Sequence, residues 1–165
     1  MNEAQRLVDL IPRLRRYARA LVNDRASADD LVQDTLERAW AKLHLYRRGT
    51  DLRAWLFTVM HNVHVNKVRS ARATDPLDDE MPELAQRAAQ GDSLVVRDLD
   101  RAIARLPDEQ RAVLLLVTLE EMSYDQVASA LGIPIGTVMS RLSRAREKLR
   151  AMMLGQPAAK LKVVK

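Results

Sequence analysis

The sequence predicts an all-α protein: two small helical domains joined by a flexible acidic linker, with a helix-turn-helix in the second domain. Apolar residues recur at steps of three and four along most of the 165-residue chain, which is the periodicity of amphipathic helices. No stretch shows the alternation that is typical of strands. An acidic segment with two prolines interrupts the helical pattern. We therefore expect domains at 1–71 and 94–154, a linker at 72–93 and a disordered basic tail at 155–165.

The composition excludes several classes of protein. The formal net charge is +5, and two basic domains flank an acidic linker, which suits two contacts with a polyanion, although ordinary solvated surface charge is an alternative. The chain has no cysteine, so neither disulfides nor a cysteine-ligated zinc site is expected. The first residues lack the pattern of a secretory signal, and no apolar run approaches the roughly 20 residues that span a bilayer. We therefore expect a cytoplasmic protein.

The first two predicted helices each combine an apolar stripe with a charged face. The first, at 3–22, carries several arginines and should stop at Asn23 and Asp24, which favour turns. The second should begin after Ser27 as N-cap, with Asp29 and Asp30 in its first turn, and run to about residue 45. Its inward stripe is expected to hold Val32, Leu36, Ala39, Trp40 and Leu43. Its outward face is regular enough to be a docking surface and holds Asp30, Gln33, Asp34, Glu37, Arg38 and Lys42.

A basic turn at 46–51 leads into a third predicted helix, from residue 52 to about residue 71. Asn62, Asn66 and Arg69 follow one another on the face opposite its apolar stripe, joined by His61, Lys67 and Arg53. Asparagine can pair with a base edge in bidentate fashion, and arginine and lysine neutralise phosphates. This face is a candidate contact with nucleic acid.

Two histidines on this helix, His61 and His64, have a spacing that could in principle share a metal. No third ligand accompanies them at a helical spacing, so we expect a surface or nucleic-acid contact rather than a metal site.

The second domain ends in the pattern that most clearly indicates a function. After two predicted helices near 94–105 and 108–119, Ser123 can cap a short helix, Gly132 can end it with a positive φ, and Pro134 suits the first turn of the next helix. That next helix has an apolar stripe at Val138, Leu142, Ala145 and Leu149. Its exposed positions carry small polar residues first and arginines further along, as in a helix that enters the major groove and grips phosphates.

Three stretches together resemble the extracytoplasmic-function (ECF) class of bacterial sigma factors. They are ADDLVQDTLERAW at 28–40, LRAWLFTVMHNVHVNKVR at 52–69 and LPDEQRAVLLLVTLEEMSYDQVASALGIPIGTVMSRLSRAREKL at 106–149. They are similar to the polymerase-docking segment, the promoter-reading helix and the C-terminal domain of that family. The resemblance implies a non-enzymatic subunit without cofactors that binds core RNA polymerase and promoter DNA and directs transcription initiation. It also implies control by an anti-sigma factor.

The resemblance further implies three groups of site residues. Polymerase binding maps to Asp30, Gln33, Asp34 and Arg38. Recognition of the minus-ten element, including a base flipped out of the stack, maps to the loop before the third helix and to that helix: Tyr46, Arg47, Arg48, His61, Asn62, Asn66 and Arg69. Recognition of the minus-thirty-five element maps to Thr137, Met139, Ser140, Arg141 and Arg144.

The chain departs from the family's pattern at two of these positions. Met139 stands where relatives commonly have lysine or arginine, which removes a candidate contact. His61 supplies less positive charge near pH 7 than an arginine would. Both departures affect the promoter sequence that we would expect, not the family.

Two other classes of function are open alternatives. An ordinary DNA-binding regulator would explain residues 106–150 but would leave the face from Asp30 to Arg38 without a task. An enzyme acting on DNA would need a nucleophile or a carboxylate cluster. The nearest approach is Asp29, Asp30 and Asp34, of which Asp29 and Asp30 point in different directions on a helix.

Overall fold

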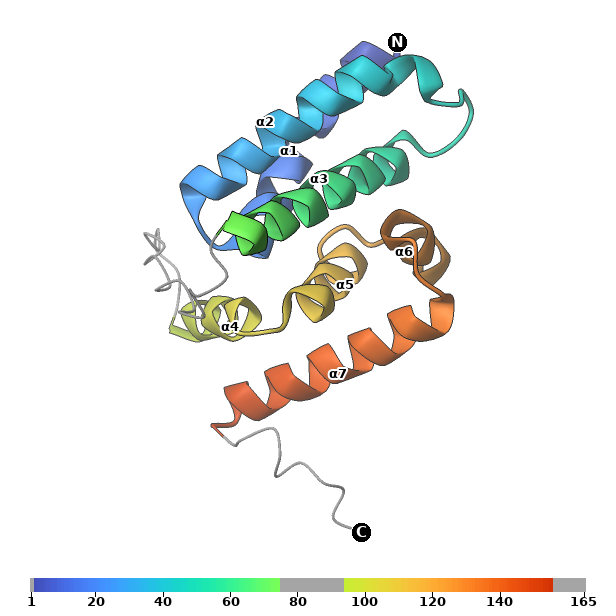
Figure 1. Cartoon of the computed structure of the whole chain (residues 1–165). Helices are drawn as coiled ribbons and strands as arrows, with labels where there is room; N and C mark the ends of the chain where they lie inside the picture. Colours follow the sequence, from blue (N-terminus) through green and yellow to red (C-terminus); the bar gives the residue numbers. More distant parts are fainter. Residues whose placement is uncertain (1, 75–93, 156–165) are drawn as a thin grey trace.

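The computed structural model describes residues 2–74 and 94–155, and the described residues form helices and no strand (Figure 1). The predicted all-α fold with two helical domains is confirmed, whereas most of the predicted linker and tail lie outside the described residues. No helix in the described ranges is both long and apolar enough to cross a membrane. The elements are α1 (Glu3–Val22), α2 (Arg25–Lys42), the 3-10 turn η1 (Leu43–Leu45), α3 (Leu52–Thr74), α4 (Leu94–Ala104), α5 (Asp108–Thr118), α6 (Tyr124–Leu131) and α7 (Ile135–Met153).

The start of α2 differs from the sequence prediction. Asn23 ends α1 in the left-handed region with φ 54°, which leaves Asp24 as the N-cap of α2. The Asp24 carboxylate accepts hydrogen bonds from the Ser27 N–H at 3.1 Å and the Ser27 hydroxyl at 2.6 Å, and these bonds lower the pKa of Asp24. The prediction that Ser27 is the N-cap was wrong, and so was the placement of Asp29 and Asp30 in the first turn.

The apolar stripe of α2 also differs at one residue. Ala28, Leu31, Val32 and Ala39 are buried, whereas Trp40 is 61% exposed. Successive residues of a helix are turned by about 100°, so a stripe that buries Ala39 leaves Trp40 outside it. The prediction that Trp40 points inward was wrong.

The helix-turn-helix, formed by α6 and α7, agrees closely with the sequence prediction. Ser123 caps α6 in a reciprocal capping box: its Oγ accepts from the Gln126 N–H at 3.1 Å, and the Gln126 side chain accepts from the Ser123 N–H at 2.9 Å. Gly132 ends α6 with φ 66°. Pro134 is the N-cap of α7, one residue before the first turn in which it was predicted. The stripe of α7 is buried at Val138, Leu142 and Ala145.

Gly132→Ala is expected to lower the free energy of unfolding by about 1–2 kcal/mol, because a Cβ disfavours the left-handed conformation. No atom lies within 4 Å of the position that a Cβ would occupy, so backbone conformation is the reason for the effect rather than a clash. Gly136→Ala is the matched control: the site is equally open and lies inside α7, where alanine is favoured, so stability should rise by about 0.5–1 kcal/mol. Urea unfolding measures both changes. Equal effects of the two substitutions would contradict this account of Gly132.

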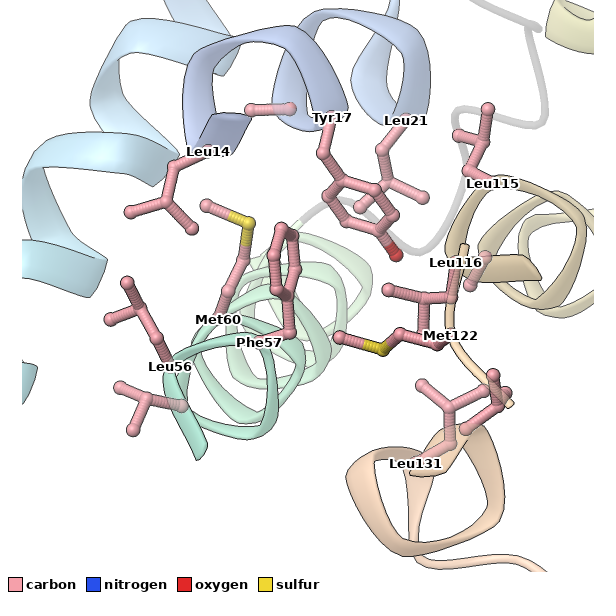
Figure 2. Packing of buried hydrophobic residues seen from close by; sticks show 14 of the residues in the cluster. Leu14, Tyr17, Leu21, Leu56, Phe57, Met60, Leu115, Leu116, Met122 and Leu131 are labelled. Carbon is pink, nitrogen blue, oxygen red and sulfur yellow. The ribbon is translucent and has the colours of Figure 1, made fainter. Parts of the chain in front are cut away.

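The two domains share one apolar core. Figure 2 shows side chains of α1 and α3 meeting side chains of α5, α6 and the turn between them. Tyr17 and Phe57 pack edge to face with ring centroids 5.1 Å apart, and burial raises the pKa of the Tyr17 phenol. In the chain, α1 packs against α4 and α5, and α3 packs against α6. The residues labelled in this core are Leu14, Tyr17, Leu21, Leu56, Phe57, Met60, Leu115, Leu116, Met122 and Leu131.

Candidate functional site

The outward face of α2 borders a groove that it shares with α3. The groove has a volume of about 580 Å³, and its lining includes Asp34 and Arg38 of α2 and Asn66 and Lys67 of α3. The Lys67 ammonium lies 2.6 Å from an Asp30 carboxylate oxygen and 2.5 Å from one of Asp34. The hydrogen bond to Asp30 is the largest cause that raises the pKa of Lys67, and the hydrogen bond to Asp34 is the next. Lys67 is thus turned toward the acidic face of α2 rather than toward the nucleic-acid face on which it was predicted.

The four residues of α2 to which polymerase binding was mapped are at least partly accessible. Asp30, Gln33 and Arg38 are exposed and Asp34 is half-buried, and all four lie along one side of α2. The surface therefore presents two carboxylates, already partly neutralised by Lys67, beside an amide and a guanidinium.

The loop between η1 and α3 is built around Tyr46, which is 7% exposed. Its hydroxyl donates to the Thr50 carbonyl at 2.5 Å, and its ring lies against that of Trp55 with centroids 5.5 Å apart. Tyr46 thus fixes the shape of the loop, whereas Arg47 and Arg48 are the basic side chains that the loop exposes.

The polar face of α3 is largely as predicted. Asn62, Asn66 and Arg69 are exposed, and their spacing of four and three places them on one side of the helix. His64 is an exception: it is buried, and its Nε2 lies 3.0 Å from an Asp108 carboxylate oxygen on α5. The expectation of a surface or nucleic-acid contact was wrong for His64.

The candidate side chains of α7 project from the face opposite its buried stripe. Met139, Ser140 and Arg144 are exposed, and Thr137 is half-buried. Arg141 is half-buried, and its guanidinium lies 3.6 Å from the Glu109 carboxylate of α5. An intradomain acid thus partly occupies one of the two arginines that were assigned to the minus-thirty-five contact.

One residue of each candidate DNA-binding set acts on the other electrostatically across the two domains. Burial is the main cause that holds the pKa of His61 below its ordinary value, and the charges of His64 and Arg141 act in the same direction, against that of Asp108. His61 of α3 and Arg141 of α7 are therefore within electrostatic range, although they belong to different domains.

The imidazole of His61 is expected to titrate below the ordinary histidine pKa of about 6.5, and an NMR titration of the free chain measures this value. His61→Gln assigns the signal, because this substitution removes one imidazole from the spectra. A pKa of His61 at or above the ordinary value would contradict its half-buried position between the domains.

Sequence reasoning missed the polar contacts that join the domains. None of the residues that make them has a local motif, and their partners lie 44 to 103 residues away in the chain. These residues are Arg16, Asp51, Arg53, Asp108, Arg111 and Glu120. Within the described ranges, no group of three or more histidine, aspartate or glutamate side chains is arranged to hold a metal ion.

Two protein families match the chain, one in each domain. The family described as the Sigma2 domain of PhyR matches residues 7–61, and the family described as Sigma-70, region 4, matches residues 97–149. The second match contains α5, α6 and most of α7, and the first contains α2 and the loop before α3.

Characterised relatives match both domains at once. The chain is 36% identical to the ECF RNA polymerase sigma factor EcfG of Rhodopseudomonas palustris, over 87% of this chain and 80% of that protein. It is also 36% identical to the ECF RNA polymerase sigma factor SigM of Mycobacterium tuberculosis, over 86% and 71% of the two chains.

Solved structures match the arrangement of the two domains as well as their folds. The sigma factor RpoE of Bartonella quintana, in complex with the anti-sigma factor NepR, is similar with a TM-score of 0.81 and 35% identity, over 92% of this chain and 96% of that one. CnrH, in complex with the cytosolic domain of CnrY, is similar with a TM-score of 0.68 and 25% identity, over 93% and 88%.

Proposed function

The chain belongs to the ECF class of RNA polymerase sigma factors and is a factor for promoter-directed transcription initiation, and we propose which surfaces carry each part of that function. The observation that supports the assignment most strongly is that relatives of this class match both helical domains in one alignment. An ordinary regulator with a helix-turn-helix would explain only the second match. We propose that core polymerase catalyses RNA synthesis and that this chain contributes promoter recognition without a catalytic residue of its own. We also propose that it acts in the cytoplasm.

The outward face of α2 is the proposed contact with core polymerase, through Asp30, Gln33, Asp34 and Arg38. Support comes from its accessibility and from its mixture of charges beside a groove, since charged surfaces of this kind orient and select partners. Lys67 holds Asp30 and Asp34 from the α3 side, so the two carboxylates keep a fixed position when a partner approaches.

The proposed minus-ten contact combines the loop before α3 with the exposed face of α3. Arg47, Arg48 and Arg69 can neutralise phosphates, and Asn62 and Asn66 can hydrogen-bond to base edges. Tyr46 contributes by holding the loop rather than by stacking on a base in this conformation, because its ring is buried. A base flipped out of the stack would need such a fixed loop to offset the loss of stacking.

The proposed minus-thirty-five contact is the exposed face of α7, with Thr137, Met139 and Ser140 near its start and Arg141 and Arg144 further along. This arrangement suits a helix whose first turns meet base edges while later arginines grip the backbone. Met139 is 53% exposed and offers an apolar contact, for example with a thymine methyl group, in place of a charge.

An anti-sigma factor is the further partner that we propose. The sigma factor RpoE of Bartonella quintana was solved with the anti-sigma factor NepR, and its structure resembles that of this chain across both domains. A partner of this kind would therefore meet an arrangement of domains that the chain already has.

Replacing Asp34 and Arg38 together with alanine is expected to weaken binding to core polymerase by about tenfold or more, as for truncation of central interface residues. Fluorescence titration of purified core polymerase with the labelled chain measures the affinity. Asp29→Ala, an exposed acid of the same helix outside the proposed surface, is the matched control and should leave the affinity unchanged. Equal affinities of the double variant and the control would remove this face of α2 from the proposed contact.

A further inference from the structure

Arginines of the N-terminal domain hold the C-terminal end of α5. The Arg53 guanidinium donates a hydrogen bond to the Glu120 carbonyl at 2.7 Å, and that of Arg16 donates to the Leu119 carbonyl at 3.3 Å. These carbonyls belong to the two residues that follow α5, at the end of the helix that carries partial negative charge, so cationic donors are favourable there. α1 and α3 thus bind one end of a helix that belongs to the other domain.

Two contacts of α5 itself continue this interface toward α1 and α3. Arg111 of α5 donates to the Leu21 carbonyl near the end of α1 at 2.7 Å. His64 of α3 contacts Asp108 at the start of α5; burial alone would raise the pKa of this carboxyl, but the hydrogen bond and the charges of His64 and Arg111 hold it below its ordinary value. These polar contacts surround the shared apolar core.

A further contact joins the interface to the proposed minus-ten loop. The Gln126 side chain of α6 donates to an Asp51 carboxylate oxygen at 2.9 Å. The other oxygen of Asp51 accepts from the Arg53 N–H at 3.0 Å, at the start of α3. The loop is therefore attached to the helix-turn-helix.

The Glu120 carboxylate destabilises this association of the two domains. The residue is 1% exposed, and neither of its carboxylate oxygens has a hydrogen-bond donor among the described residues. The nearest cations are the guanidinium groups of Arg16 and Arg13, at 3.6 and 3.8 Å. Burial raises the pKa of Glu120 despite the charges of Arg13, Arg16 and Arg53. These ion pairs are long, so they offset only part of the cost of burying the carboxylate, and the remainder destabilises the state that buries it.

The closed arrangement cannot serve both DNA elements at once. The minus-ten and minus-thirty-five elements lie about 25 base pairs apart, which is on the order of 85 Å at about 3.4 Å per pair. The 19-residue helix α7 is only about 29 Å long, and His61 of α3 lies within electrostatic range of Arg141 on α7. Simultaneous contact with both elements therefore requires the domains to separate.

We propose that the free chain closes on itself through the arginine contacts to the end of α5, with its two DNA-binding domains held together, and that the buried charge of Glu120 keeps this closed state weak enough to open. The consequence for DNA rests on the proposed function, whereas the closure itself does not. Arg53→Ala should favour the open state, because it removes the donor to the Glu120 carbonyl. Glu120→Gln should favour the closed state, because an amide of similar shape removes the buried charge.

The distance between the domains tests this proposal without polymerase or DNA, so its failure is distinct from failure of the proposed function. The chain has no cysteine, so Ala41→Cys on α2 and Ser129→Cys on α6, both exposed, provide a unique pair of spin labels for pulsed EPR. Arg15→Ala, an exposed arginine of α1 outside the contacts with α5, is the matched control. Circular dichroism verifies that each variant keeps its helices.

We expect one predominant short distance in the unsubstituted chain and in Arg15→Ala. Arg53→Ala should lower the ratio of closed to open chains roughly tenfold and add longer distances. Adding Glu120→Gln to Arg53→Ala should shift the ratio back toward closed, again by roughly tenfold. A broad distribution already present in the unsubstituted chain, or a further opening on adding Glu120→Gln, would overturn the proposal.

Discussion

Phe57→Ala is expected to lower the free energy of unfolding by about 3–5 kcal/mol, the largest effect of any single substitution proposed for this chain. Phe57 is fully enclosed where α1, α3 and the C-terminal domain meet, and its ring packs against the edge of Tyr17 (Figure 2). Truncation removes apolar contacts and leaves a cavity that neighbours from three helices can fill only in part. Urea unfolding, followed by circular dichroism, measures the change.

Val8→Ala provides the comparison for Phe57→Ala. Val8 is 52% exposed on α1, so its truncation should change stability by no more than about 0.5 kcal/mol. Comparable effects of the two substitutions would contradict the position of Phe57 at the centre of a shared core.

Arg144→Ala should weaken promoter binding by the holoenzyme by about 1–3 kcal/mol, roughly 5- to 150-fold, if its guanidinium contacts a base edge or a phosphate. Arg144 is exposed on α7, whereas its neighbour Arg141 is partly occupied by Glu109. Arg144 can therefore meet DNA directly, whereas Arg141 would first have to leave the Glu109 carboxylate.

The salt dependence of binding separates two roles for Arg144. Loss of a phosphate contact should reduce the slope of log affinity against log salt by about one and weaken all sequences alike, whereas loss of a base contact should relax specificity at one position. Arg146→Ala is the matched control: this arginine is exposed on the same helix, but a step of two residues turns its side chain by about 200° from that of Arg144. Unchanged affinity and unchanged salt slope for Arg144→Ala would remove it from the proposed contact.

Local sequence patterns were sufficient for the helices and for the helix-turn-helix. The φ of Gly132, the capping box at Ser123 and the buried stripe of α7 all follow from interactions within a few residues, which is why the sequence could predict them. Where two capping residues compete, as Asp24 and Ser27 do, the connection from the preceding helix decides, and periodicity does not contain that information. The prediction for Trp40 was wrong for a related reason: the residue lies at the edge of the apolar stripe of α2, and the width of that stripe depends on the neighbouring helices.

The contacts between the domains could not be predicted from the same patterns. His64 appeared to belong to an exposed face, and its burial depends on Asp108, which lies 44 residues away in the chain. Glu120 has no local pattern that distinguishes it from other polar residues after a helix, yet arginines from the other domain lie beside its carboxylate. The side chain of Lys67 is long enough to lie either on the nucleic-acid face of α3 or against α2, and it contacts Asp30 of α2. Each of these positions is decided by tertiary packing rather than by local propensity.

Promoter-dependent transcription by the reconstituted holoenzyme tests the central claim most directly. Core RNA polymerase, with and without the purified chain, is given linear genomic fragments, and the transcript ends are mapped. We expect defined start sites that appear only when the chain is present, each preceded by a shared pair of sequence elements. Absence of any start site that depends on the chain, together with tight sequence-specific DNA binding by the chain alone, would contradict its assignment as a sigma factor.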